Sequence, residues 1–219
     1  MLNKIRDIFS IVLIASIFLG RSPLPALESG SDKRPFERDQ EQPQTIKKVL
    51  DGDTFVLSNN ERVRLIGVDT PEQGEPFSDA ARRFADSVLV GAKIRVENDK
   101  PQRDKYDRIL AYVFVDDSLL FNELLLRRGL ANAYLFKENK RLVKRLISAQ
   151  NEARKFKRGI WSIDKPSDEP YYISAGGSFR FHRPLCTLIK NINQKKASRY
   201  KNRDAALDKG LSPCRECRP

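Results

Sequence analysis

The middle of the chain is predicted to fold as an α+β domain, a small closed β-barrel covered by helices. Three observations predict it: short alternating strands separated by turns, three segments with helical spacing, and a 40% apolar fraction in 219 residues, enough for one medium core. The same composition excludes a mostly disordered chain, a collagen-like chain and a multi-span membrane protein. The odd number of cysteines, 3, disfavours a disulfide-rich scaffold.

Five short strands and three helices are expected along residues 45–163. The strand candidates alternate apolar and polar residues, and they are two runs within 45–57, then Arg62–Val68, Lys93–Glu97 and Ile109–Val115. The helix candidates repeat apolar residues at three- and four-residue steps, and they are Ser78–Leu89, Asn122–Arg128 and Lys140–Lys157. Five short strands wrapped with helices suit a barrel of the OB type.

The N-terminus has the pattern of a targeting segment. Lys4 and Arg6 precede an apolar run from Ile8 to Leu19, and the small residue Ala26 follows, an order typical of a secretory signal. The run is shorter than the about 20 residues of a transmembrane helix. We expect a signal peptide over residues 1–26, with an uncleaved membrane anchor or a buried core helix as alternatives. Residues 27–44 are expected to be a flexible linker. The protein is therefore expected to be exported, either secreted or periplasmic.

The net charge of +12 predicts an anionic partner, which is nucleic acid, anionic lipid or an acidic protein. The excess is uneven. Residues 45–163 carry a net charge of +6, and residues 179–219, here called the tail, carry +8. A stretch over residues 164–178 is expected to link them. This distribution indicates two functional units with different tasks.

Charged residues in the middle segment gather at turns and strand ends. The carboxylates are Asp51, Asp53, Asp69 and Glu72, and the arginines are Arg64 and Arg108. Singly, an Asp in a turn is ordinary, because its side chain bonds the nearby backbone. Arg64 also lies five residues before Asp69, so a flat strand would place them on opposite faces unless a bulge or strong twist intervenes.

Together these groups suit metal-assisted hydrolysis of a phosphodiester. Several carboxylates hold a hard cation such as Ca²⁺. Two arginines bind a phosphodiester and stabilise the negative charge that develops on it, and a further carboxylate orients or deprotonates water. The single histidine of the chain is His182, so a histidine-dependent hydrolase centred in residues 45–163 is excluded.

Five segments carry this chemistry in order along the chain. They are Asp51-Gly52-Asp53-Thr54, Arg64-Leu65-Ile66-Gly67-Val68-Asp69-Thr70-Pro71-Glu72, Asp104-Lys105-Tyr106-Asp107-Arg108, Arg128-Gly129-Leu130-Ala131 and Gly159-Ile160-Trp161. In composition and order they resemble the staphylococcal nuclease (thermonuclease) family over about residues 45–163. The resemblance implies a five-stranded OB-fold barrel with three helices. It also implies Ca²⁺-dependent hydrolysis of DNA and RNA to 3′-phosphate products.

The resemblance also implies roles for single residues. Arg64 and Arg108 match the two phosphate-binding arginines, and Glu72 matches the residue that activates or orients the attacking water. Metal ligands are implied at the carboxylates of Asp53 and Asp69 and at the backbone carbonyl of Thr70. The remaining matches are Asp51 as an outer-shell aspartate and Lys105, Tyr106 and Tyr134 around the nucleotide pocket.

One departure and two rival functions accompany this interpretation. Phe136 stands where the family's well-known example has a second tyrosine, so stacking on a base is kept but one hydroxyl contact is lost. The main alternative is a non-catalytic nucleic-acid-binding OB module. Degenerate relatives of this fold should lack Arg64, Glu72 or Arg108, and all three are present here. A third hypothesis, an envelope-anchored interaction protein with membrane contact, requires an uncleaved N-terminus. No protein partner is inferred.

The tail collects all the sulfur and imidazole ligands of the chain. Their spacing is His182-x3-Cys186 and Cys214-x2-Cys217. Zn²⁺ prefers four N or S ligands in tetrahedral geometry, and a Cys₃His set is typical of a closed structural site. The alternative is a redox pair or disulfide between Cys214 and Cys217, which an oxidising compartment favours.

A zinc site would also supply stability that the tail's few apolar residues lack. The segment Pro213–Pro219 is similar to part of the zinc-binding domain of the bacterial alkylated-DNA repair protein Ada, although His182 replaces a cysteine. This similarity implies the metal site, and not methyl-transfer chemistry. The net charge of +8 favours a DNA-binding auxiliary module, with a solvated basic face as the alternative.

Overall fold

The computed structural model describes residues 44–163 and 169–219. The expected signal peptide, residues 1–26, and the expected linker up to residue 43 lie outside the described residues. Within the two described stretches, no helix combines the length and the apolar character that a membrane crossing needs.

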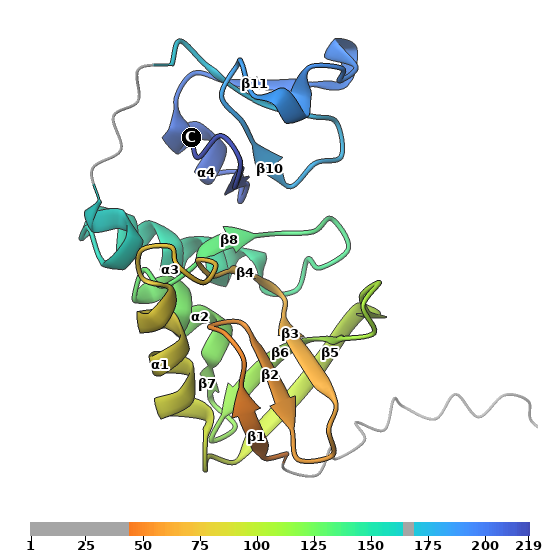
Figure 1. The fold of residues 1–219 in the computed structure, drawn as a ribbon, viewed down its shortest axis with the longest axis vertical. Coiled ribbons are helices and arrows are strands. Elements are labelled where there is room, and N and C mark those ends of the chain that lie inside the picture. Colours follow the sequence, from red (N-terminus) through yellow and green to blue (C-terminus); the bar gives the residue numbers. More distant parts are fainter. Residues whose placement is uncertain (1–43, 164–168) are drawn as a thin grey trace, which may run out of the picture. The chain divides into compact units, whose positions relative to one another are not determined.

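The barrel is built on one curled sheet (Figure 1). Its strands are β1 (Ile46–Val49), β2 (Thr54–Leu57), β3 (Arg62–Leu65), β5 (Ile94–Arg103), β6 (Ile109–Val115) and β7 (Leu119–Leu120). They lie in the order β1-β2-β3-β6-β5, with β7 paired to β6. The pairing of β3 with β6 is parallel, and the other pairs are antiparallel.

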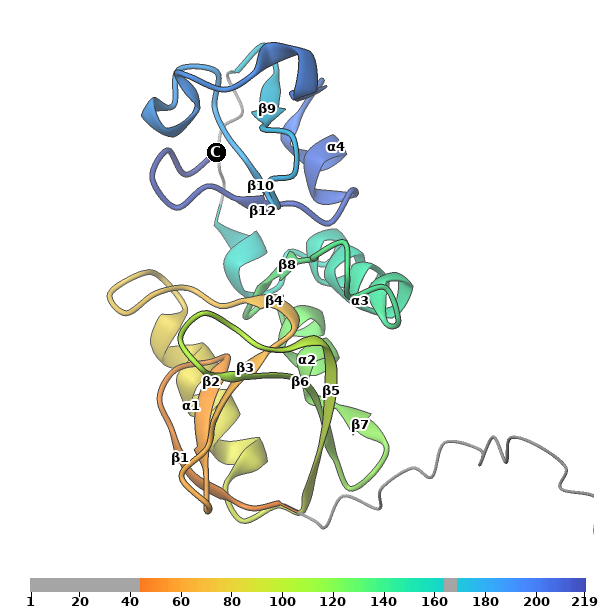
Figure 2. The ribbon, with the colours of Figure 1, turned by 90° about the vertical axis from the view of Figure 1, so that its right-hand side faces the viewer.

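The sheet closes between its first and last strands. Gln44, just before β1, exchanges two backbone hydrogen bonds with Ile94 of β5, at 2.9 and 3.2 Å. Figure 2 shows the strands curling around one interior. Phe55, Val63, Ala111 and other fully buried side chains fill that interior. This is the closed barrel that the strand pattern predicts, although β5 runs to Arg103 and is longer than expected.

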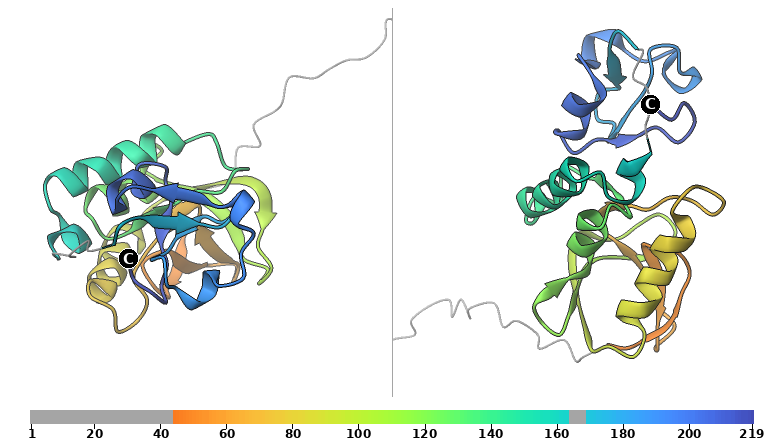
Figure 3. Two further views of the ribbon diagram at one scale, coloured as in Figure 1. Left: turned by 90° about the horizontal axis from the view of Figure 1, so that it is seen from above. Right: turned by 90° about the vertical axis from the view of Figure 1, so that its left-hand side faces the viewer.

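Three helices accompany the barrel, as predicted. They are α1 (Ser78–Leu89), α2 (Phe121–Arg127) and α3 (Val143–Lys155), and a single turn of 3₁₀ helix, η1 (Gly159–Ser162), follows α3. Helix α1 lies along the outside of the barrel (Figure 3). Its buried residues Ala81, Ala85 and Leu89 recur every four residues, so they form one face toward the core.

The third predicted strand is broken into two. Residues Arg62–Val68 were expected to be continuous, but β3 ends at Leu65 and β4 (Gly67–Asp69) pairs with a different strand, β8 (Asn132–Tyr134). Gly67 has a φ of 77°, and a Cβ there would lie 2.5 Å from Leu146 Cδ1 of α3. The left-handed backbone favours glycine, and any larger residue would also force the buried side chain of Leu146 to move.

A buried side-chain amide holds this break in place. Asn122, at the start of α2, donates to the carbonyl of Ile66 at 2.8 Å and to that of Ala111 at 3.4 Å. Its Oδ1 accepts from the backbone N–H of Val113 at 3.0 Å. Because every one of these groups is buried, the amide satisfies backbone atoms that water cannot reach. It thereby ties the end of β3 to β6 and to α2.

Helices α2 and α3 are joined by a carboxylate, which gives a prediction on stability. Glu123 accepts hydrogen bonds from Arg127 and Arg145. Burial acts to raise the pKa of Glu123, but these bonds outweigh it and hold the pKa below its usual value. A carboxyl whose pKa is lower in the folded state contributes stability above the unfolded pKa, and loses it as the pH falls through the folded pKa.

We therefore expect Glu123→Gln to lower the free energy of unfolding by about 1 kcal/mol at neutral pH. The difference from the native chain should shrink as the pH falls below the ordinary value of 4.5. Urea unfolding at neutral pH and again below pH 4.5 measures this difference in the free energy of unfolding. Substitution of the exposed Glu138 by Gln is the control. A loss of the same size at both pH values would contradict the role of the ionised carboxylate.

The tail has its own small fold. Its elements are β9 (Tyr172–Ser174), β10 (Arg180–Phe181), η2 (Thr187–Ile189), η3 (Gln194–Lys196), β11 (Ser198–Tyr200), α4 (Arg203–Leu207) and β12 (Ser212–Pro213). Strand β9 pairs with β11, and β10 pairs with β12 in parallel. Tyr172 and Phe181 are fully buried in one apolar cluster. The folded tail thus includes β9, which lies within the stretch 164–178 that was expected to be a linker.

Candidate active site

A cleft of about 270 Å³ brings together most of the residues singled out in the barrel. Its lining includes Asp51, Asp53, Arg64, Asp69, Thr70, Glu72, Arg108 and Tyr134. These residues come from the β1–β2 turn, from β3, from β4 and the loop after it, and from the starts and ends of later strands. The curl of the sheet and the break after Leu65 are what bring such distant positions into one cleft.

Asp53 is the most constrained carboxylate of the cleft. Its Oδ2 accepts from the backbone N–H of Thr70 at 2.8 Å and from its Oγ1 at 2.9 Å. Its Oδ1 lies 3.1 Å from Arg64 Nε, and its backbone N–H donates to Asp51 Oδ1 at 3.0 Å. Burial raises the pKa of Asp53, against the opposing effect of Arg64. The bond to Asp51 therefore supports the backbone of the turn that carries Asp53.

Arg64 lies between the two buried aspartates. Besides Asp53, its Nη2 lies 3.6 Å from Asp69 Oδ1, and its Nη1 donates to the carbonyls of Leu65 and Val68 at 2.6 and 2.9 Å. A flat strand would have kept Arg64 and Asp69 on opposite faces. The break at Gly67 removes that restriction, because β4 turns back toward the side chain of Arg64.

Arg108 is positioned by a neighbouring carboxylate. Asp104 accepts from Arg108 Nε at 2.7 Å and lies 2.7 Å from its Nη2. Burial acts to raise the pKa of Asp104, but the bonds from Arg108 and from the backbone outweigh it and keep the pKa below its usual value. The carboxylate is therefore ionised, and two guanidinium nitrogens of Arg108 contact it.

Two of the expected nucleotide-pocket residues lie outside the cleft lining. Tyr106 is 64% exposed, and the ammonium of Lys105 and the guanidinium of Arg108 lie 4.9 and 5.5 Å from its ring centre. Tyr134 does line the cleft. Tyr106 therefore contacts the cleft residue Arg108, Lys105 contacts Tyr106, and Tyr134 lies in the cleft itself.

Two residues of the cleft lining, Arg180 and Arg215, belong to the tail and were not predicted, and a third tail residue, Ser212, contacts the cleft residue Asp69. Arg180 of β10 lies 3.0 Å from Asp69 Oδ2 through its Nη2, and its guanidinium lies 4.7 Å from the ring centre of Tyr134. Ser212 of β12 donates to Asp69 Oδ2 at 3.1 Å. Arg215 pairs with both Asp69 and Glu72. The surplus of positive charge in the tail was the only sequence signal for the two arginines, and it suggested nucleic acid as their partner, whereas nothing in the sequence pointed to Ser212.

Aromatic side chains next to the cleft also come from both units. The rings of Tyr134 and Phe136 meet edge to face with centres 4.8 Å apart. Phe179 of the tail lies 4.4 Å from Phe136 and 6.1 Å from Tyr134, measured between ring centres. The position with phenylalanine in place of the family's second tyrosine therefore contacts the tail.

The oxygen donors of the cleft fit a calcium ion. The side chains of Asp53 and Asp69 are each only 6% exposed, and Thr70 is buried beside them. Hard divalent cations take oxygen ligands such as carboxylates and carbonyls, and these three residues offer two carboxylates together with the carbonyl and hydroxyl oxygens of Thr70. No histidine or cysteine competes within the lining, so a softer ligand set is absent from this cleft as described.

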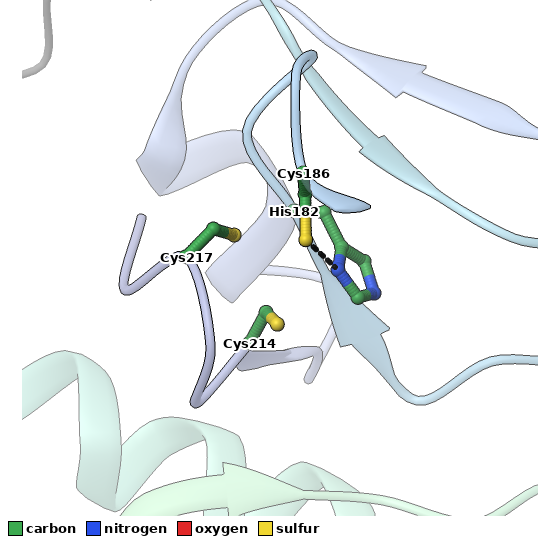
Figure 4. A group of neighbouring side chains, drawn as sticks. All are labelled: His182, Cys186, Cys214 and Cys217. Carbon is green, nitrogen blue, oxygen red and sulfur yellow. Dashed lines mark hydrogen bonds between the residues drawn. The ribbon is translucent and has the colours of Figure 1, made fainter. Parts of the chain in front are cut away.

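A second group of metal-type ligands lies within the tail. One donor atom from each of His182, Cys186, Cys214 and Cys217 lies within 4.8 Å of all the others, and Figure 4 shows the four side chains converging from two segments. The parallel pairing of β10 with β12 brings the segments together, since Phe181 pairs with Pro213. His182 Nδ1 lies 3.4 Å from Cys186 Sγ. Burial raises the pKa of Cys217 to about 12.

Comparison with known proteins finds relatives of the part of the chain that forms the barrel. A family model described as staphylococcal nuclease homologue matches residues 62–163. The thermonuclease of Staphylococcus hyicus is 37% identical over 131 residues, which cover 56% of this chain and 77% of that protein. The chain belongs to the staphylococcal nuclease family. Another member, the thermonuclease of Staphylococcus intermedius, is 40% identical over 125 residues, 53% of this chain and 74% of that protein.

Membership of the staphylococcal nuclease family confirms two predictions, the OB-type barrel with helices and the enzyme class, a nuclease-type hydrolase. The endonuclease YncB of Bacillus subtilis is a further relative, 39% identical over 130 residues, which cover 54% of this chain and 61% of that protein. The matched family model ends at residue 163. The tail lies beyond it, with the two arginines that line the cleft and with its cysteines.

Proposed function

We propose that the protein is a calcium-dependent nuclease that hydrolyses DNA and RNA to 3′-phosphate products. The observation that carries this proposal is one cleft that joins an oxygen-donor set, two arginines of the barrel, Arg64 and Arg108, and an accessible carboxylate. Each part corresponds to a requirement of phosphodiester hydrolysis: charge neutralisation, phosphate binding and activation of water.

The proposed roles follow from exposure and contacts. Asp53, Asp69 and the carbonyl of Thr70 would hold calcium, which would supply positive charge at the phosphate that is cleaved. Arg64, held between the two aspartates, would donate to a phosphate oxygen. Arg108, fixed by Asp104, would approach the same phosphate, since it lines the same cleft. Both arginines are pre-positioned by carboxylates, so little reorganisation is needed when the substrate binds.

Glu72 would orient or deprotonate the attacking water. Its side chain is 56% exposed, in contrast with the buried aspartates, so water can reach it. Its backbone N–H donates to Glu75 Oε2 at 2.9 Å, which fixes the loop that carries it. An exposed carboxylate beside a cation site is suited to accept a proton from water.

A non-catalytic nucleic-acid-binding module is the second candidate. Such a module needs basic and aromatic groups but no water-activating carboxylate. Arg64, Glu72 and Arg108 line one cleft here, and this joint placement favours catalysis.

Digestion of denatured DNA by the purified protein tests the proposal. We expect cleavage in the presence of Ca²⁺, no cleavage with a calcium chelator, and 3′-phosphate ends on the products. Binding of single-stranded DNA without calcium-dependent cleavage would instead establish the non-catalytic module. RNA digested under the same conditions tests the second substrate.

The tail is proposed to be a zinc-stapled module that assists nucleic-acid binding. Four converging N and S donors in a partly buried setting suit tetrahedral Zn²⁺, and the backbone N–H of Arg183, 3.3 Å from Cys217 Sγ, would support a thiolate ligand. The similarity of Pro213–Pro219 to the zinc-binding domain of Ada agrees with this. Export of the protein is likewise proposed, on the N-terminal sequence pattern alone.

A further inference from the structure

Arg215 is held in the loop between two of the proposed zinc ligands. It directly follows Cys214 and lies two residues before Cys217. The backbone N–H of Arg218 donates to the carbonyl of Cys214 at 3.0 Å, and Arg183 Nε donates to the carbonyl of Cys217 at 3.0 Å. The backbone that carries Arg215 is therefore fixed by the fold of the tail.

The guanidinium of Arg215 reaches two carboxylates of the nuclease cleft. Its Nη2 pairs with Asp69 Oδ1, and its Nη1 pairs with Glu72 Oε1. Asp69 belongs to the oxygen-donor set, and Glu72 is the exposed carboxylate next to it. One side chain thus bridges two groups whose proposed roles both require carboxylate oxygens that are free to bind something else.

Asp69 is the carboxylate with the most cationic surroundings in the cleft. Its Oδ1 faces Arg215 and, at 3.6 Å, Arg64. Its Oδ2 faces Arg180 at 3.0 Å and accepts from Ser212 at 3.1 Å. Three of these four groups come from the tail. A cation that binds Asp69 therefore meets like charges, and the strongest repulsion comes from a guanidinium in direct contact with the same oxygen.

We propose that Arg215 sets the calcium affinity of the nuclease cleft by competing with the metal for Asp69 and Glu72. The inference rests on the proposed function, because it places calcium at Asp53 and Asp69. The guanidinium has to leave Asp69 before the metal binds, and the phosphates of an incoming strand are the anions that would receive it. Calcium and nucleic acid would then each strengthen the binding of the other.

Calorimetric titration of Ca²⁺ into the purified protein, without nucleic acid, tests this competition. We expect Arg215→Ala to lower the calcium Kd by about tenfold, because a contacting positive charge has gone. Arg215→Lys keeps the charge and should lie between the two. The matched control is Arg199→Ala, which removes the same charge from the same tail, where the guanidinium stacks on Tyr171 at 4.8 Å.

A second titration tests the coupling to nucleic acid. With a phosphorothioate single strand present, the calcium Kd of the native chain should fall, and that of Arg215→Ala should fall much less. An unchanged Kd in Arg215→Ala without nucleic acid would overturn the inference. So would an equal effect of Arg199→Ala, since it would reflect net charge and not contact.

The outcomes separate this inference from the proposed function. A native chain that neither binds calcium nor cleaves DNA would overturn both. A native chain that binds calcium and cleaves DNA, with an Arg215→Ala variant of unchanged Kd, would overturn the competition alone.

Discussion

Glu72→Gln is expected to lower kcat for calcium-dependent DNA cleavage by about 100- to 10,000-fold, the range that positioned acid–base groups contribute. The amide keeps the size of the side chain but accepts no proton from water. Because Glu72 is more than half exposed, the fold and the thermal unfolding temperature should be unchanged. Steady-state kinetics on denatured DNA at saturating Ca²⁺ provides the measurement.

The matched control for this variant is Glu75→Gln, three residues further along the same loop. Glu75 accepts from the backbone N–H of Glu72 and lies 3.3 Å from Arg218 through its other oxygen, and it lies outside the lining of the nuclease cleft. Its substitution should affect kcat far less. Equal losses in the two variants would show that loop structure, and not proton transfer, carries the effect.

The second large effect is expected in the tail, when a substitution of a proposed zinc ligand removes the metal. We expect the purified protein to hold about one Zn²⁺ per chain, and Cys214→Ser to lose it, because structural zinc sites contribute folding energy directly. The tail should then unfold while the barrel, with its own core, stays folded. Metal analysis and hydrogen exchange on the two regions measure this.

Thr187→Ala, at the exposed first residue of η2 directly after Cys186, is the control for the zinc experiment and should keep the metal. A metal-free protein with a bond between Cys214 and Cys217 would favour the redox interpretation instead. None of the three cysteines is in a disulfide in the structure, so each can lose its proton and bind a metal as a thiolate.

The sequence predicts most of the barrel. The elements that it misses are short strands, and they are missed for one reason. The observed bounds of α1 and β6 are those predicted, since both elements are long enough for apolar periodicity to show. Strands β4 and β8 span three residues each, too few for a pattern. Their pairing depends on Gly67, whose positive φ no periodicity reveals.

Residues of the candidate site could be predicted one by one only where they stand in a sequence motif. Asp53, Arg64 and Glu72 stand in segments with a recognisable order, and the structure gathers them in one cleft. Ser212 reaches Asp69 across 143 residues, and no local pattern encodes such a contact. The four proposed zinc ligands of the tail could be singled out because few residue types offer sulfur or imidazole donors. Arg180 and Arg215 could not be singled out, because arginines are numerous in a basic chain.

The bonds of Asn122 separate the scaffold of the cleft from its electrostatics. This neutral amide, buried and joined to the backbone at Ile66, Ala111 and Val113, fixes the strand break without any ion pair. Mobile ions screen charges that face solvent, but they leave buried neutral hydrogen bonds intact. Rising ionic strength should therefore lower the affinity for nucleic acid while the cleft keeps its shape. Activity should then return when the salt concentration is lowered again.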